Sequence, residues 1–142
     1  MTRQQRIVSI VLGLLVFYAA LWTASEWWEK ALAKPYGTAS ISPDGCFQVQ
    51  TFRPFWVLPG FLHPQTPPDD AMERSWFVSW ESPAFFRLYD LRNGRVLGES
   101  EIYDLVAYGG PLDWAYGNDH TVSAAMIHIG TTPDDCTAPR TP

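Results

Sequence analysis

Positive charge is scarce in this chain. Its 142 residues include ten lysines and arginines against fifteen aspartates and glutamates. From Lys34 onward the shortage is greater, with seven basic residues against thirteen acidic ones and a net charge of −6. A protein that binds nucleic acid needs a basic face for the phosphates, so this balance argues against nucleic acid as a partner. It suits a basic protein partner, and it is also the ordinary charge of a soluble domain.

Cysteine is nearly absent as well. Cys46 and Cys136 are the only two, and they lie 90 residues apart with no CxxC pair. This spacing argues against thioredoxin-type redox chemistry and zinc ribbons. One cysteine near each end of the folded region predicts a single disulfide bond, which an oxidising compartment would preserve. On the chain-entropy model such a bond stabilises by roughly 4–5 kcal/mol. The alternative is a pair of free buried thiols.

The familiar catalytic motifs are missing. There is no GxSxG elbow, HExxH pair, GxxxxGK[ST] loop or GxGxxG turn. His63, His120 and His128 fall in different predicted elements, and Asp119-His120 with Ser123 has no visible oxyanion partner. We therefore predict no enzymatic activity, no catalytic residue, no cofactor and no metal site.

One long apolar run opens the chain. Arg3 and Arg6 precede residues 7–24, a stretch of about 18 residues, near the minimum length for a transmembrane helix. Arginines on the N-terminal side predict that the C-terminal part is exported. Ala31-Leu32-Ala33 fits a signal-peptidase site but lies far beyond the apolar run, past Glu26, Glu29 and Lys30. An uncleaved anchor is favoured over a cleaved signal peptide, and Trp22, Trp27 and Trp28 are typical of an interfacial aromatic belt.

The rest of the chain predicts an all-β domain, a small antiparallel sheet or sandwich behind one N-terminal helix. Asn93-Gly94 within Phe85–Ser100 is a strong hairpin pattern. A two-residue loop is an alternative, but a four-residue loop pairs Asp90 with Arg95 and is preferred. Other predicted strands cover 46–53, 75–81 and 121–129, with a shorter one at 102–106. Pro35-Tyr36-Gly37 predicts a break, which gives a helix and linker over 1–37 and a β domain over 38–142.

Between the first two strands lies a loop with five prolines, Pro54–Asp70, which cannot be a central strand. Long loops of this kind are often functional, and aromatic side chains are frequent anchors at interfaces. Alternatively, the aromatic side chains cover the sheet as a lid. An acidic group follows later in the chain and suits either a partner or a charged edge strand. The predicted partner-binding residues are Phe55, Trp56, Phe61, Asp69, Asp70, Glu99, Glu101 and Asp104.

A resemblance adds to these patterns. The chain contains SPDGCFQVQTFRPFWVLPGFLHP, then WFVSWESPAFFRLYDLRNGRVLGESEIYDL, then GGPLDWAYG and MIHIG. Over about residues 40–136 it resembles small membrane-anchored bacterial proteins that act as immunity partners of type VI secretion lipase effectors of the phospholipase D kind. The resemblance implies an inner-membrane protein with one transmembrane segment and a periplasmic domain. That domain would bind and inhibit a phospholipase effector toxin.

The charge and the motifs are compatible with that implication. An inhibitor needs a scaffold, projecting loops and charge complementary to a basic phosphate-binding site, but no chemistry of its own. The alternative is a structural or accessory protein of an envelope assembly, held at the membrane by the same anchor.

Overall fold

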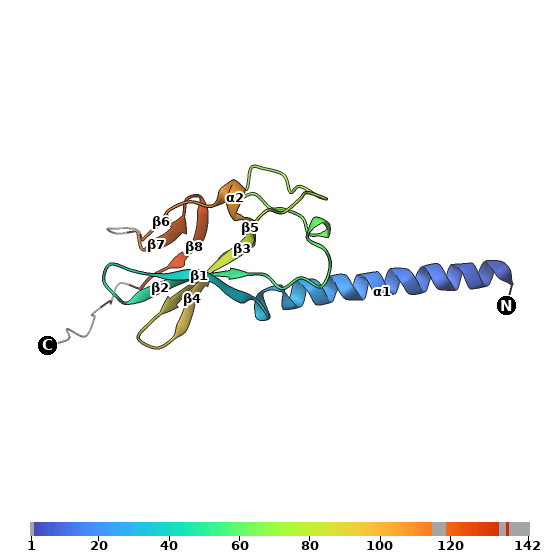
Figure 1. Cartoon of the computed structure of the whole chain (residues 1–142), viewed down its shortest axis with the longest axis horizontal. Helices are drawn as coiled ribbons and strands as arrows, with labels where there is room; N and C mark the ends of the chain where they lie inside the picture. The colour runs from blue at the N-terminus through green and yellow to red at the C-terminus, as the bar shows by residue number, and fades with distance from the viewer. Residues whose placement is uncertain (1, 115–118, 134–135, 137–142) are drawn as a thin grey trace.

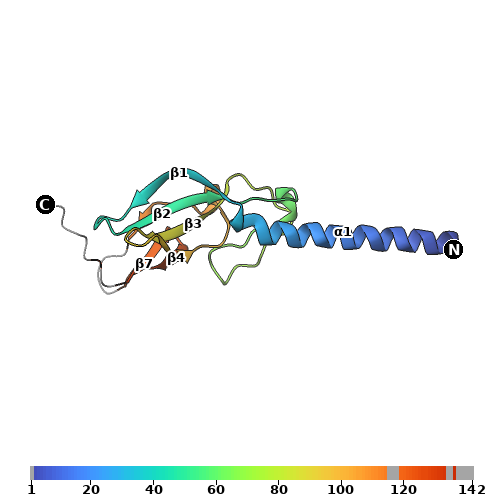
Figure 2. The same cartoon turned by 90° about the horizontal axis from the view of Figure 1, so that it is seen from below.

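The computed structural model describes residues 2–114, 119–133 and 136. The described chain forms two antiparallel sheets behind a single N-terminal helix (Figure 1), which confirms the predicted fold class. The helix projects as a rod from one end of the β domain in both perpendicular views (Figures 1 and 2).

Helix α1 spans Arg3–Ala31, longer than the apolar run that begins it. Thr2 caps its N-terminus in a capping box with Gln5. Residues 7–20 of the run are exposed, so α1 is not a core helix of this fold. Its length and composition allow a membrane span or a signal sequence.

The first sheet has the strand order β1-β2-β3-β4, formed by β1 (Lys34–Ile41), β2 (Phe47–Arg53), β3 (Pro83–Asp90) and β4 (Arg95–Glu99). β5 (Tyr103–Asp104) also pairs with β3. The predicted break at residues 35–37 is wrong, because these residues belong to β1. An edge strand tolerates Pro35, and a register shift near Gly37 (φ 72°) absorbs the irregularity.

The β3–β4 hairpin has the predicted four-residue loop, since Asp90 pairs with Arg95. Gly94 takes a positive φ of 70° in the turn. The buried Asp90 carboxylate accepts hydrogen bonds from Arg92 and Asn93, which fix the loop from inside.

The second sheet is built from short segments after α2 (Leu105–Tyr108): β6 (Leu112–Asp113), β7 (Thr121–Ala124) and β8 (Ile127–Thr131). The single strand predicted over 121–129 is wrong, because the chain reverses at Ala125, whose φ is 52°. This turn has no Gly or Asn, so the sequence carries no turn pattern there.

The strand predicted over 75–81 is also wrong. In this described range the chain is irregular, and the one bridge links Ser75 to Gln65. Alternating Trp76, Val78 and Trp80 has the strand period but no neighbouring strand to pair with. The predicted strand at 102–106 shortens to β5, because Asp104 caps α2 instead.

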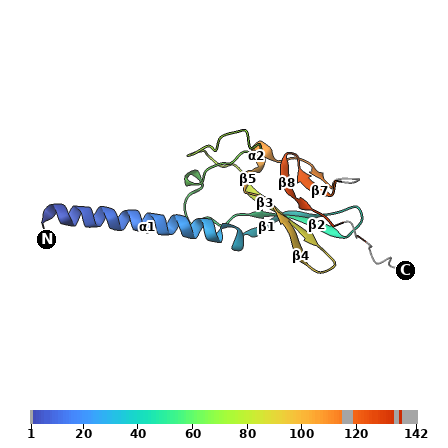
Figure 3. The same cartoon turned by 180° about the vertical axis from the view of Figure 1, so that it is seen from behind.

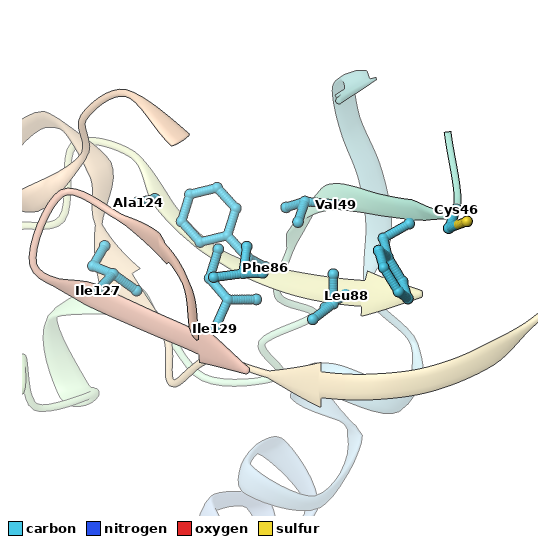
Figure 4. Close-up of a cluster of buried hydrophobic side chains, with 9 residues drawn as sticks. Cys46, Val49, Phe86, Leu88, Ala124, Ile127 and Ile129 are labelled. Atoms are coloured by element: carbon cyan, nitrogen blue, oxygen red, sulfur yellow. The ribbon is translucent and has the colours of Figure 1, made fainter. Parts of the chain in front are cut away.

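The main core lies between the two sheets. Phe86, Leu88 and Val49 from the first sheet point toward Ile127 and Ile129 of the second (Figure 4). Each such buried side chain contributes about 1.5–3 kcal/mol. The sheets approach closely where β4 meets β8: a Cβ on Gly98 would lie 2.7 Å from the Gly130 Cα. The predicted disulfide between Cys46 and Cys136 is present, with its Cα atoms 6.1 Å apart, and closes the domain.

A second apolar cluster covers the opposite face of the first sheet. It contains Phe52, Phe85 and Ile102, with Trp56 and Trp80 packed against it. Both faces of the β2–β3 pair are therefore covered, and Phe52 is buried on the face opposite the main core. Trp56, from the long loop after β2 that also holds the 3-10 helix η1 (Gly60–Leu62), and Trp80, from the segment before β3, supply this second cover.

Candidate functional site

The C-terminal end of α1 is fastened to the β domain through its backbone. The Phe55 amide donates to the Glu29 carbonyl at 2.8 Å, and Arg87 Nη2 donates to the Lys30 carbonyl at 2.8 Å. Carbonyl groups in the last turn of a helix have no partner within the helix, so the domain satisfies groups that would otherwise need water. The positive guanidinium also suits the negative end of the helix dipole. The last turn of α1 is thus part of the domain.

An ion-pair network extends this attachment to β4. Lys30 Nζ lies 3.3 Å from a Glu99 carboxylate oxygen and 3.6 Å from one of Glu101, and it donates to the Ser100 carbonyl at 2.9 Å. Arg87 also pairs with Glu99. The carboxylate of Glu99 is therefore neutralised within the molecule.

A polar cluster lies between α1 and the long loop, formed by Ser25, Glu26, Glu29, Trp56 and His63; we call it the junction cluster. The buried imidazole of His63 has Nε2 3.2 Å from Ser25 Oγ and Nδ1 3.2 Å from Glu26 Oε1. With the proton on Nδ1, His63 donates a hydrogen bond to Glu26, and its Nε2 accepts a hydrogen bond from the Ser25 hydroxyl. Ser25 Oγ in turn accepts the Val57 amide at 3.1 Å.

This series has the residue types of a nucleophile–base–acid relay. However, Ser25 has no exposed surface, and its oxygen already accepts a backbone amide. A substrate would need access to that oxygen. The geometry supports a role in attaching the helix, where each buried polar group satisfies another.

Glu29 completes the cluster from the next turn. Its carboxylate accepts a hydrogen bond from Trp56 Nε1 at 3.1 Å, and the Trp56 ring stacks on His63 with centroids 4.3 Å apart. Burial raises the pKa of Glu29 to about 7, against a lowering by the Trp56 hydrogen bond and a further increase from Glu26. Glu29 lies beyond the apolar residues 7–24, so it belongs to the junction cluster and not to the apolar run.

A cavity of about 120 Å³ opens beside the cluster, lined by several of its members together with Arg74, Trp80 and Glu101. Glu26, Glu29 and His63 each offer a ligand atom within 4.8 Å of the others. Carboxylate and imidazole are donors that bind divalent cations. The sequence predicts no metal site, because its three histidines fall in different predicted elements.

The predicted partner-binding residues fall into two groups. The first is exposed: Phe55 and Phe61 expose 41% and 53% of their surface, and Asp69 and Asp70 lie on the loop beyond them. Asp69 caps its own turn by accepting the Ala71 amide, and Glu101 is exposed although it pairs with Lys30. These side chains are exposed and can contact a partner.

The second group is engaged inside the molecule. Asp104 is buried, and its carboxylate accepts the amides of Glu81, Ser82 and Val106, so its predicted place on a partner surface is wrong. A residue that caps a helix is fixed by unpaired backbone donors. Trp56 and Glu99 are held by α1. The aromatic residues of the loop split accordingly, Trp56 serving as part of a lid and Phe55 and Phe61 remaining outside.

Sequence reasoning missed the α1 side of this site. Ser25 and Glu29 are spaced by four residues, which places both on one face of a helix just after the apolar run. That spacing indicates a polar helix face but names no partner, because His63 is 38 residues further on.

Comparisons with protein-family models, curated proteins and solved structures found no match. The fold and the junction cluster by themselves define a β domain attached to the end of one long apolar helix.

Proposed function

We propose that this protein is a membrane-anchored immunity protein, which binds a type VI secretion phospholipase effector in the periplasm and blocks its hydrolysis of phospholipid. One observation carries the proposal: the domain is attached to α1 so that its long loop lies beside the end of the apolar run. Trp22, in that run, lies 5.6 Å from the ring of His63, in the loop. A toxin that hydrolyses membrane lipid acts at the membrane surface, where the apolar run ends. An inhibitor fixed at that surface would meet the toxin there.

The attachment supports an uncleaved anchor. Cleavage after Ala33 would remove the Ser25 hydroxyl from His63, the Glu29 carboxylate from Trp56 and the Lys30 amine from Glu99. Arg3 and Arg6 favour a cytoplasmic N-terminus, and the disulfide suits an oxidising compartment. These features favour the bacterial inner membrane with the β domain in the periplasm.

The exposed residues of the predicted partner surface give the proposed contact. Phe55 is an apolar anchor, while Asp69, Asp70 and Glu101 supply negative charge for a basic active site. Trp56 does not belong to this contact, because its replacement would loosen α1. An inhibitor of this kind needs no catalytic residue.

The test measures phospholipid hydrolysis by a phospholipase encoded beside this protein. Vesicles carry the full chain, and the toxin is added at increasing ratio. We expect inhibition that saturates at one to one. Phe55→Ala should weaken it by about tenfold or more with an unchanged thermal midpoint, as is usual for a buried interface anchor. Leu91→Ala, at the exposed β3–β4 turn, is the control and should inhibit normally.

Undiminished hydrolysis at several-fold excess of the folded chain would contradict the immunity function and favour the envelope-accessory alternative. Inhibition that survives Phe55→Ala would keep the function and move the interface elsewhere.

A further inference from the structure

Large apolar side chains are exposed on the part of the domain nearest α1. Phe61 on η1 exposes 53% of its surface, and Trp76 and Phe77 in the loop before β3 expose 54% and 73%. We call these three residues the aromatic rim. Single exposed apolar residues are common, but three large ones at one end of a small domain indicate a surface that is covered.

The aromatic rim lies at the depth where the apolar run of α1 ends. The ring of Trp76 stacks on that of Trp22 with centroids 6.4 Å apart, and Trp22 belongs to residues 7–24. In Figure 3 the loop before β3 and η1 both reach back along α1, away from the sheets. The apolar surface of the helix therefore continues onto the domain without a polar gap at this contact.

The backbone at Phe77 supports an outward-facing role. Its φ is 56°, a left-handed conformation that is unfavourable for a bulky residue, and its side chain is the most exposed of the rim. Phe77 buries little of its side chain within the domain, so burial there does not offset the unfavourable backbone conformation. Burial of the ring in a surrounding apolar layer would offset it.

The segment just before the rim carries both signs of charge, with Glu73 and Arg74 exposed. Arg74 is exposed two residues before Trp76 and is of the sign that phosphate attracts. The carboxylate of Asp70 lies near β5, where burial, then Glu101 and Asp70, raise the pKa of Tyr103.

We propose that the aromatic rim inserts into the boundary between headgroups and acyl chains of the membrane that α1 crosses. The occupant is the lipid surface itself. Trp27 and Trp28, exposed on α1 just past the apolar run, complete the belt. Aromatic side chains favour this boundary because they combine an apolar body with a polar or polarisable edge. The domain is then fixed by two contacts, the helix and the rim, and cannot swing about the helix end.

This inference rests on the proposed membrane span and not on the toxin. The test uses the full chain in lipid vesicles with one introduced cysteine labelled by the environment-sensitive dye NBD; the native cysteines are already paired. The labelled variants are Phe77→Cys, Phe61→Cys, Val16→Cys within the apolar run, and Val96→Cys on β4 as the aqueous control. The vesicles contain phospholipid with a nitroxide at acyl carbon 5 and, for position 16 at the middle of the proposed span, phospholipid with the nitroxide at acyl carbon 12.

We expect the nitroxide lipid to quench the dye at positions 77 and 61 roughly threefold more than at position 96, with blue-shifted emission, as for a group at the acyl boundary. Quenching at 16 but equally weak quenching at 77, 61 and 96 would overturn the aromatic rim while leaving the span intact. Absence of quenching at 16 would overturn the span and the rim together.

Discussion

Single polar residues decide how α1 and the β domain are held together. Glu29 is the most informative, because its carboxylate is partly buried, bonded to Trp56 and adjacent to Glu26. A half-buried acid is costly when it is charged, so the attachment depends on its protonation.

Glu29 should make the stability of the protein depend on pH. Its folded pKa of about 7 lies above the ordinary value of 4.5, so the folded state holds a proton that the unfolded state has released. Stability therefore falls as pH rises from about 4.5 to 7, and the loss is complete above that range. Glu29→Gln keeps an acceptor for Trp56 but cannot ionise. We expect its thermal midpoint in detergent to fall less between pH 5 and 8 than that of the wild type.

The control is Glu73→Gln, which changes an exposed carboxylate. Its midpoint should follow the wild-type curve. Equal pH dependence in all three proteins would show that Glu29 is not the titrating group.

At the scale of elements, the packing of the two sheets depends on a contact between two glycines, which have no side chains. β4 and β8 meet at Gly98 and Gly130, and a Cβ on Gly98 would be closer to the facing backbone than van der Waals contact allows. The two strands can approach this closely only because both positions are glycine. The core residues Phe86, Leu88, Ile127 and Ile129 pack beside this contact.

Gly98→Ala should therefore destabilise the protein by about 1–3 kcal/mol, the usual cost of overpacking, because rigid backbone and not a flexible side chain faces the added methyl group. Denaturant unfolding followed by circular dichroism measures it. Gly13→Ala is the control for adding a methyl group without a clash: nothing lies within 4 Å of its added Cβ, and Ala is favoured in a helix, so its midpoint should not fall. A Gly98→Ala midpoint equal to that of Gly13→Ala would mean that the sheets separate at little cost.

At the scale of the whole molecule, the helix and the domain behave as one structural unit. The helix contributes hydrogen-bond acceptors, a buried serine and ion-pair partners to the domain, and the domain satisfies the end of the helix. A separate leader peptide would have no need of these contacts.

We expect the chain isolated from membranes to retain α1. Intact mass and N-terminal sequencing of the membrane fraction measure this, and resistance to alkaline carbonate extraction is the control for integral insertion. A mature chain that begins at Lys34 and appears in the soluble fraction would contradict the anchor. Loss of α1 should also lower the thermal midpoint, because His63 would lose its hydrogen-bond partners Ser25 and Glu26 and the Trp22 ring that stacks on it.

The sequence by itself determined the features that depend on local pattern. The apolar run before polar residues gives the helix, Asn93-Gly94 with Asp90 and Arg95 gives the hairpin and its loop length, and two cysteines permit one pairing. The helix and the hairpin follow from residues that are neighbours in the chain, and the disulfide follows because only one pairing of two cysteines exists.

The tertiary structure decided everything that required a partner from a distant segment. Trp76, Val78 and Trp80 alternate like a strand, yet within the described residues they lack a strand edge to pair with, and one stacks on the helix instead. In the sequence, Asp104 and Glu99 resemble free surface acids. In the structure, Asp104 accepts hydrogen bonds from backbone amides and Glu99 forms an ion pair with Lys30. Ser25 and His63 meet across 38 residues. Charge and periodicity describe a residue alone, while its role is fixed by the groups that pack against it.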